Sequence, residues 1–235
     1  MALRTKTGCG MMECKKALVA AEGNFDEAIK ILREKGLAVA AKKADRIAAE
    51  GIVDILKEGG RTVIAEVNAE TDFVAKNASF QEFVKGILRT ILKNAPKNME
   101  ELLALPYDCG DRSVEAELKD KIFTIGENMS IRRFEIIDGV TGTYIHGGGN
   151  AGVVTKFEVS DGLAETAGFQ EYAKNVCMQI AAMNPAYLDE ASVPADVIAH
   201  EKEILTAQLA EDEKNKNKPA QVIEKIVQGR IGKYY

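Results

Sequence analysis

The sequence predicts an α+β fold made of three parts. The first 50 residues and the last 50 carry helical periodicity, whereas the middle of the chain alternates apolar and polar residues in short segments typical of antiparallel strands. An internal repeat indicates two similar halves in that middle part, because Phe80–Lys85 (Phe-Gln-Glu-Phe-Val-Lys) recurs as Phe169–Lys174 (Phe-Gln-Glu-Tyr-Ala-Lys). Each copy follows a strand pair that ends in Glu-Val, so we expect a sheet followed by a helix in both halves.

The first 50 residues are expected to form three helices. Gly23 ends the first helix and Asn24 caps the second, which Gly36 ends. An Ala-rich, basic third helix runs from about Leu37 to Ala49. The first helix is expected to bury one face, which is formed by Met11, Cys14, Leu18 and Ala21.

Two apolar residues, Met12 and Val19, fall on the opposite face of this first helix, beside Lys15. Solvent is expected on that face, so exposed apolar side chains there indicate contact with a partner. The alternative is that Met12 packs on the third helix.

Strands replace helices after Gly51. Ile52–Lys57 and Thr62–Asn68 are expected to form a β-hairpin around Gly59-Gly60. A capping box at Ser79–Glu82 begins a long helix that ends near Lys93. The elements expected after it are a short helix near Glu100–Ala104, a helix at Ser113–Phe123, strands at Ile131–Ile137, Val140–His146 and Val153–Val159, and a helix from Phe169 to about Met183.

The segment Thr71-Asp72-Phe73-Val74-Ala75-Lys76 is the most informative part of the sequence. It lies in the loop before the helix at Ser79, where neither strand nor helix periodicity asks for a Phe and a Val. The second half of the repeat lacks a counterpart, with ten residues between Glu158 and Phe169 against thirteen between Glu66 and Phe80. We therefore expect a partner, and not the core, to take Phe73 and Val74. The alternative is that Phe73 folds back on the sheet as a lid.

The C-terminal residues predict an antiparallel helical hairpin. One helix runs from Pro194 to about Asp212, the polar run Glu213–Lys218 forms a turn, and Pro219 starts a return helix.

Composition argues against several classes of protein. No apolar run approaches the length of a membrane span and the N-terminus lacks a signal-peptide stretch, so a soluble cytoplasmic protein without a membrane partner is expected. The net charge is −5 and no basic stripe is present, which disfavours a nucleic-acid partner. Cys9 and Cys14 form the only close pair among four Cys, so no metal site is expected and Cys14 is interpreted as a core residue.

The sequence holds no recognisable catalytic or cofactor motif. The glycine run Gly147–Gly149 lacks the Lys and the Ser or Thr of a phosphate loop and is interpreted as a hairpin turn, so no cofactor is expected. The two histidines, His146 and His200, lie near no nucleophile signature. Two alternatives stay open: an adaptor that uses the helical unit alone, and a metal-free hydrolase that uses His146 with Asp138 or Glu135.

Five segments of the chain resemble the elongation factor Ts family, in order and with family-like spacing. They are Thr7–Leu18 (Thr-Gly-Cys-Gly-Met-Met-Glu-Cys-Lys-Lys-Ala-Leu), Ala40–Ala44, Glu66–Asn68 with Thr71–Lys76, Gly126–Arg133 and Tyr144–Gly147. The resemblance implies a guanine nucleotide exchange factor that binds elongation factor Tu with GDP and promotes GDP release during translation elongation, without covalent chemistry.

The resemblance also implies a domain plan. It comprises a ubiquitin-associated-like helical domain at 1–46, a two-subdomain core at 47–139 and 140–184, the second subdomain completed by 229–235, and a coiled-coil hairpin at 185–228. Family members continue past the segment matching Gly229-Arg230 into a last core strand, whereas this chain ends at Tyr235. An open edge is therefore expected on the second subdomain.

The resemblance finally implies which residues face the partner. Asp72, Phe73, Val74 and Ala75 are expected to intrude near the Mg²⁺ site of the partner's GTPase domain and to dislocate that ion. Further partner contacts are expected at Arg4, Met11, Met12, Lys15, Thr71, His146 and Gly147.

Overall fold

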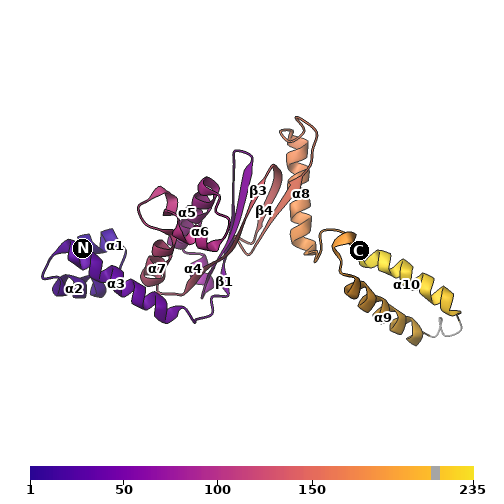
Figure 1. Ribbon diagram of the computed structural model, residues 1–235, viewed down its shortest axis with the longest axis horizontal. Helices are drawn as coiled ribbons and strands as arrows, with labels where there is room; N and C mark the ends of the chain where they lie inside the picture. Colours follow the sequence, from indigo (N-terminus) through magenta and orange to yellow (C-terminus); the bar gives the residue numbers. More distant parts are fainter. Residues whose placement is uncertain (213–217) are drawn as a thin grey trace. The chain divides into compact units, whose positions relative to one another are not determined.

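The computed structural model describes residues 1–212 and 218–235 and shows the expected mixture of helices and antiparallel sheets (Figure 1). The chain divides into two compact units, Met1–Ala182 and Met183–Tyr235. The turn expected at Glu213–Lys218 lies, apart from Lys218, outside the described residues.

Three helices form the N-terminal part, but their boundaries differ from those expected. They are α1 (Ala2–Thr7), α2 (Met11–Ala20) and α3 (Phe25–Lys43). Asn24 caps α3 as expected, because its Oδ1 accepts hydrogen bonds from the backbone N–H groups of Asp26 and Glu27. The expected break at Gly36 is wrong, and α1 was not anticipated.

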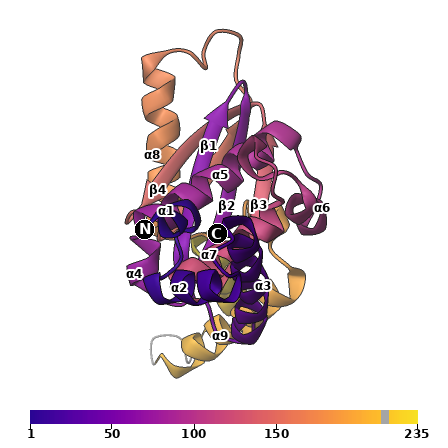
Figure 2. The same cartoon turned by 90° about the vertical axis from the view of Figure 1, so that its left-hand side faces the viewer.

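Tertiary packing explains why α3 continues through Gly36. α3 lies beside α7 (Val114–Ile125), as Figure 2 shows. A Cβ at Gly36 would lie 3.4 Å from the ring of Phe123, so the missing side chain lets α7 approach closely. The glycine therefore serves helix packing and not helix termination.

The first sheet contains three antiparallel strands in the order β1 (Glu50–Glu58), β2 (Arg61–Ala69) and β3 (Met129–Asp138). Gly59 and Gly60 form the β1–β2 turn with left-handed φ values of 58° and 79°, which confirms the predicted hairpin. The expected apolar face of β2 is buried through Val63, Ala65 and Val67, but Thr62 and Asn68 on the other face are buried as well.

Helix α5 (Ala78–Asn94) covers that buried face and forms the main core with it. The residues of α5 that are almost fully buried are Phe80, Phe83, Val84, Ile87, Leu88 and Ile91. The expected capping box at Ser79 is wrong: the capping residue is Asn77, whose Oδ1 accepts a hydrogen bond from Ser79 N at 2.8 Å. Because asparagine is among the best capping residues, the helix begins earlier than expected.

Three short elements connect α5 to the last strand of the first sheet. The expected helices appear as α6 (Met99–Ala104) and α7, and the 3₁₀ helix η1 (Tyr107–Cys109) lies between them. Tyr107 stacks on Phe83 at a centroid distance of 5.6 Å, which ties this connection to the core.

The second half of the repeat forms a two-stranded sheet and one helix: β4 (Val140–His146), β5 (Ala151–Phe157) and α8 (Ala167–Met183). Gly149 O accepts a hydrogen bond from Val53 N at 2.8 Å, so the β4–β5 turn joins the outer edge of β1. The buried hydroxyls of Thr62 and Thr141 bond at 2.7 Å and link the two sheets.

The second unit contains the expected helical hairpin, with the 3₁₀ helix η2 (Glu190–Ser192), α9 (Ala195–Glu211) and α10 (Ala220–Tyr234). Its small core is formed by Leu209, Val227 and Ile231. The structure differs from the expectation at 229–235, because burial of Ile231 continues α10 through Tyr234 and keeps these residues in the hairpin.

The two candidate caps of α5 can be told apart by stability. Asn77→Ala is expected to lower the free energy of unfolding by about 1 kcal/mol, because it removes the acceptor for an otherwise unpaired helix N–H group. Urea denaturation followed by circular dichroism measures this loss.

The matched variant is Ser79→Ala, which is expected to change the same free energy by less than about 0.5 kcal/mol. A larger loss for Ser79→Ala than for Asn77→Ala would contradict the assignment of the cap.

Candidate functional site

The segment after β2 is a one-turn helix, α4 (Asp72–Ala75), where a loop was expected. Thr71 caps it, because its Oγ1 accepts a hydrogen bond from Val74 N at 3.4 Å. Thr71 is therefore part of the local fold as well as a residue that the sequence assigns to partner contact.

The helical turn sends neighbouring side chains to opposite sides. Val74 and Ala75 are buried in the main core, at 7% and 8% exposure, whereas Phe73 is 81% exposed. Successive residues of a helix point about 100° apart, which separates Phe73 from Val74. The expectation that the core leaves Val74 to a partner is wrong, and so is the alternative in which Phe73 is a lid on the sheet.

A carboxylate from a distant part of the chain holds the start of α4. Glu127 accepts two hydrogen bonds from Thr71, one from the backbone N at 3.0 Å and one from Oγ1 at 2.7 Å. Sequence analysis missed Glu127, because 56 residues separate it from Thr71 and no periodicity links them. Its place in the Gly126–Arg133 segment, which resembles the family, is the one signal that could have drawn attention to it.

The first residue of α4 carries an exposed negative charge. The Asp72 carboxylate accepts a hydrogen bond from Lys76 Nζ at 2.7 Å. This hydrogen bond and the attraction of the ammonium group hold the pKa of Asp72 below its ordinary value of 3.8, and they raise the pKa of Lys76. Asp72 therefore remains ionised at neutral pH, directly beside the exposed Phe73 ring.

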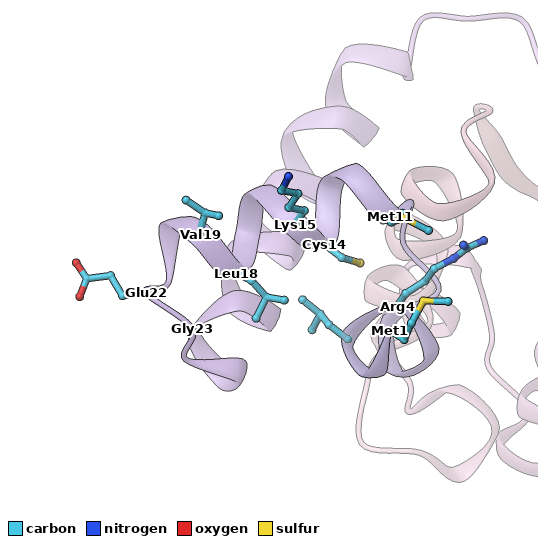
Figure 3. Close-up of a pocket in the computed structure, with 10 residues that line it drawn as sticks. Met1, Arg4, Met11, Cys14, Lys15, Leu18, Val19, Glu22 and Gly23 are labelled. Carbon is cyan, nitrogen blue, oxygen red and sulfur yellow. The ribbon is translucent and has the colours of Figure 1, made fainter.

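A second group of predicted site residues lies along a groove between α1 and α2. Arg4, Met11 and Lys15 line this groove, which has a volume of about 440 Å³. Figure 3 shows Cys14 and Leu18 pointing from α2 toward α1, while Lys15 and Val19 point away from α1. The groove is thus lined largely by apolar side chains, and the cationic residues Arg4 and Lys15 also line it.

The exposure of α2 differs in part from the expectation. Met12 and Val19 are exposed, which contradicts the alternative in which Met12 packs on a third helix. Met11 is also exposed, so its predicted place in the core is wrong. Cys14 is buried as predicted, and Ala17 is buried beside it. The buried face of α2 therefore begins at Cys14, one helical turn after Met11.

The remaining predicted residues lie in the β4–β5 hairpin. His146 ends β4, and its Nδ1 lies 3.0 Å from the hydroxyl of Tyr144 on the protein surface. Gly147 follows with a left-handed φ of 59°, where a side chain would collide with Asn150. The hairpin turn is as predicted.

The structure gives no support to the hydrolase alternative in which His146 acts with Asp138. Asp138 pairs with Arg61 at 2.7 Å, and the full length of β4, about 20 Å, lies between Asp138 and His146. Within residues 1–212 and 218–235, no three His, Cys, Asp or Glu side chains are grouped to hold a metal ion. None of the helices in the described part of the chain has the length and apolar character that a membrane crossing requires.

Comparison with known proteins identifies the family. The family model described as elongation factor TS matches residues 70–235. The chain is also 49% identical, over 236 aligned residues, to the elongation factor Ts of Syntrophotalea carbinolica (strain DSM 2380 / NBRC 103641 / GraBd1), and the match covers 99% of this chain and 76% of that protein. The chain therefore belongs to the elongation factor Ts family, a family of translation elongation factors.

Proposed function

We propose that this protein is a guanine nucleotide exchange factor, which binds elongation factor Tu with GDP and promotes GDP release during translation elongation. Membership in the elongation factor Ts family supports the partner. One structural observation carries the mechanism: Phe73 is 81% exposed on a helical turn whose next two residues, Val74 and Ala75, are buried. A large apolar side chain held in solvent in this way is typical of a binding anchor.

The chemistry of GTPases indicates how such an anchor acts. A GTPase holds GDP through hydrogen bonds to the phosphates and through Mg²⁺, which neutralises phosphate charge. Phe73 acts as an apolar wedge in a pocket of the partner, and the ionised Asp72 beside it perturbs the partner's Mg²⁺ site. Val74 and Ala75 serve as the buried base of the wedge.

Fixation of α4 within its own domain favours this mechanism. Ordering a flexible loop on binding would consume about 1 to 2 kcal/mol of conformational free energy per residue. Thr71 is already held by Glu127, and Val74 is already in the core, so the backbone beside Phe73 is ordered before the partner arrives. More of the binding free energy is then left to displace nucleotide.

Two further surfaces orient the partner in this proposal. The first surface is the groove between α1 and α2 together with the exposed face of α2, and it binds the partner through Arg4, Met11, Met12 and Lys15. The second surface is the end of β4, where His146 and Gly147 contact the partner. Contacts at separate places fix the direction in which Phe73 enters the partner.

The same thermodynamic coupling releases the factor. If the factor weakens GDP binding, nucleotide weakens binding of the factor to the same extent. Exchange by this coupling therefore needs no covalent step. The proposed mechanism also uses no cofactor and no nucleic acid. Its proposed location is the cytoplasm, where translation elongation takes place.

We also propose a domain plan for this function. The helical domain at 1–46 clamps the partner, the core subdomains at 47–139 and 140–184 carry α4 and the β4–β5 hairpin, and the helical hairpin follows. In this plan 229–235 belong to that hairpin, and the packing of Ile231 of α10 with Leu209 and Val227 supports this.

Release of labelled GDP from elongation factor Tu tests the proposed function. The protein is expected to accelerate release at catalytic concentrations in the presence of excess unlabelled nucleotide. Binding to elongation factor Tu without faster release would favour the adaptor alternative, and absence of binding would contradict the proposal.

Phe73→Ala is expected to slow GDP release far more than it changes stability. Truncation of a buried aromatic anchor costs roughly 2 to 4 kcal/mol of complex or transition-state stabilisation. An exposed residue changes the free energy of unfolding by only about ±0.5 kcal/mol. Stopped-flow GDP release and urea denaturation measure the two quantities.

Leu188→Ala is the matched control, because Leu188 is a large apolar residue that is 93% exposed in the second unit. Equal effects of Phe73→Ala and Leu188→Ala on GDP release would show that Phe73 is not the wedge.

Asp72→Ala is expected to slow GDP release, with a larger effect when Mg²⁺ is abundant, because the proposed role of Asp72 is to perturb the ion's site. A Mg²⁺ titration of the release rate measures this dependence, with Asp161→Ala as a control that removes an exposed carboxylate elsewhere. A loss of rate that does not vary with Mg²⁺ would rule out this role.

Met12→Ala is expected to weaken binding of elongation factor Tu by about 1 kcal/mol, or roughly fivefold in Kd, with unchanged melting. Calorimetric titration measures the Kd. Met183→Ala is the control, because Met183 is similarly exposed, at 69% against 60% for Met12. Unchanged affinity of Met12→Ala would remove Met12 from the interface.

A further inference from the structure

The turn between α7 and β3 contacts two segments that are distant from it in sequence. Gly126 ends α7 with a left-handed φ of 92°, and Glu127 and Asn128 follow before β3 begins. Glu127 is partly buried and Asn128 is 8% exposed. Neither side chain belongs to the main apolar core, so the structural role of each follows from its hydrogen bonds.

Glu127 contacts the start of α4. Its two carboxylate oxygens each accept one hydrogen bond from Thr71, so the backbone N–H and the hydroxyl of one residue are held together. Only a carboxylate offers two acceptors in this arrangement, whereas the amide of glutamine would present one acceptor and one donor.

Asn128 contacts the segment that leads from α3 to β1. Its Nδ2 donates to Arg46 O at 2.8 Å and to Ala44 O at 3.3 Å. Its backbone N donates to Glu70 Oε1 at 2.6 Å, and the same oxygen lies 3.5 Å from Arg46 Nη1. Asn128 is thus bonded on one side to the end of the helical domain and on the other to the residue before Thr71.

The Gly126–Asn128 turn therefore joins the two parts of the molecule that carry predicted partner contacts. α3 leads back to α2 and its groove, and α4 presents Phe73. A further contact strengthens the link, because Lys43 Nζ at the end of α3 donates a hydrogen bond to Gly126 O.

We infer that Glu127 and Asn128 are positioning residues for nucleotide exchange: Glu127 fixes α4, and Asn128 fixes the end of α3 against the same turn. Neither side chain needs to touch the partner. Glu127 acts through Thr71 on the direction of Phe73, and Asn128 acts on the placement of the helical domain. This inference rests on the proposed exchange function for its kinetic test, but its structural test needs no partner.

The first experiment compares Glu127→Gln with wild type in the free protein. Glutamine replaces the charge-assisted hydrogen bonds of the carboxylate with neutral ones and places a donor against the Thr71 hydroxyl, so hydrogen exchange of the Val74 amide, which Thr71 caps, is expected to speed by about tenfold. Glu115→Gln is the matched control, because Glu115 is exposed on α7 and pairs only locally with Lys119. Equal exchange of Val74 in wild type and Glu127→Gln would overturn the inference for Glu127.

The second experiment separates positioning from binding in the GDP-release assay. Glu127→Gln is expected to lower the maximal release rate by about tenfold, with less than about a twofold change in the half-saturating concentration of the factor. A raised half-saturating concentration with an unchanged maximal rate would identify Glu127 as a contact residue and overturn its positioning role. If wild type itself fails to release GDP, the proposed function is wrong, while the hydrogen-exchange result still decides the structural part.

Asn128→Asp tests the other arm of the turn. The variant keeps the backbone N–H that bonds Glu70 but places an acceptor against the carbonyls of Ala44 and Arg46. Asn128 is only 8% exposed, so its side chain is not available for contact with the partner, and the variant is expected to raise the half-saturating concentration by about fivefold because the helical domain loses its fixed position. An unchanged half-saturating concentration would overturn the role of Asn128.

A second variant covers the case in which Glu127→Gln fails to fold. Glu127→Asp keeps the charge but shortens the side chain by one methylene, so the carboxylate withdraws from Thr71 while the Oγ1 cap of the Val74 amide stays in place. Faster exchange of Val74 in this variant, with retained circular dichroism, supports the inference, and unchanged exchange contradicts it.

Discussion

The candidate site depends on one helical turn, in which Val74 is buried and its neighbour Phe73 is exposed. The turn is anchored twice, since Val74 and Ala75 pack in the core that α5 forms with the first sheet, and Thr71 is held by the Glu127 carboxylate. With both anchors in place, Phe73 has no route into the core of its own domain. Its exposure is therefore a property of the fold, and we propose that its apolar surface is buried in a pocket of the partner.

The exposure of Phe73 costs stability, and in our proposal binding of the partner offsets this cost. Leaving a phenylalanine in water forgoes roughly 1.5 to 3 kcal/mol of burial free energy. The main core compensates, with α5 burying six large apolar residues against and around the sheet. A well-packed domain that holds a small exposed segment in a fixed position is consistent with the proposed role, in which the protein lowers the affinity of its partner for GDP.

Local patterns predicted most of the fold. The β1–β2 hairpin, α5, α7 and the helical hairpin follow from alternation, helical spacing and the glycine turn. Failures arose where tertiary contacts override local signals: Gly36 is a packing residue against Phe123 and not a helix stop, and 229–235 stay helical because Ile231 is buried. At the candidate site the exposure of Phe73 was predicted, but the burial of Val74 was not. The sequence predicted a loop, whereas the helical turn points the side chains of Phe73 and Val74 in different directions. Glu127 lies 56 residues from Thr71, and a single sequence holds no physical signal for that contact.

We propose that the anchoring of α4 acts through Phe73. A double-mutant cycle of GDP release, with Phe73→Ala measured in wild type and in Glu127→Gln, separates this coupling from independent effects. Strong coupling is expected: once Glu127 no longer fixes the turn, removal of the Phe73 ring should slow GDP release far less than it does in wild type. If the two substitutions instead slow release by independent factors that multiply, Glu127 does not act through Phe73.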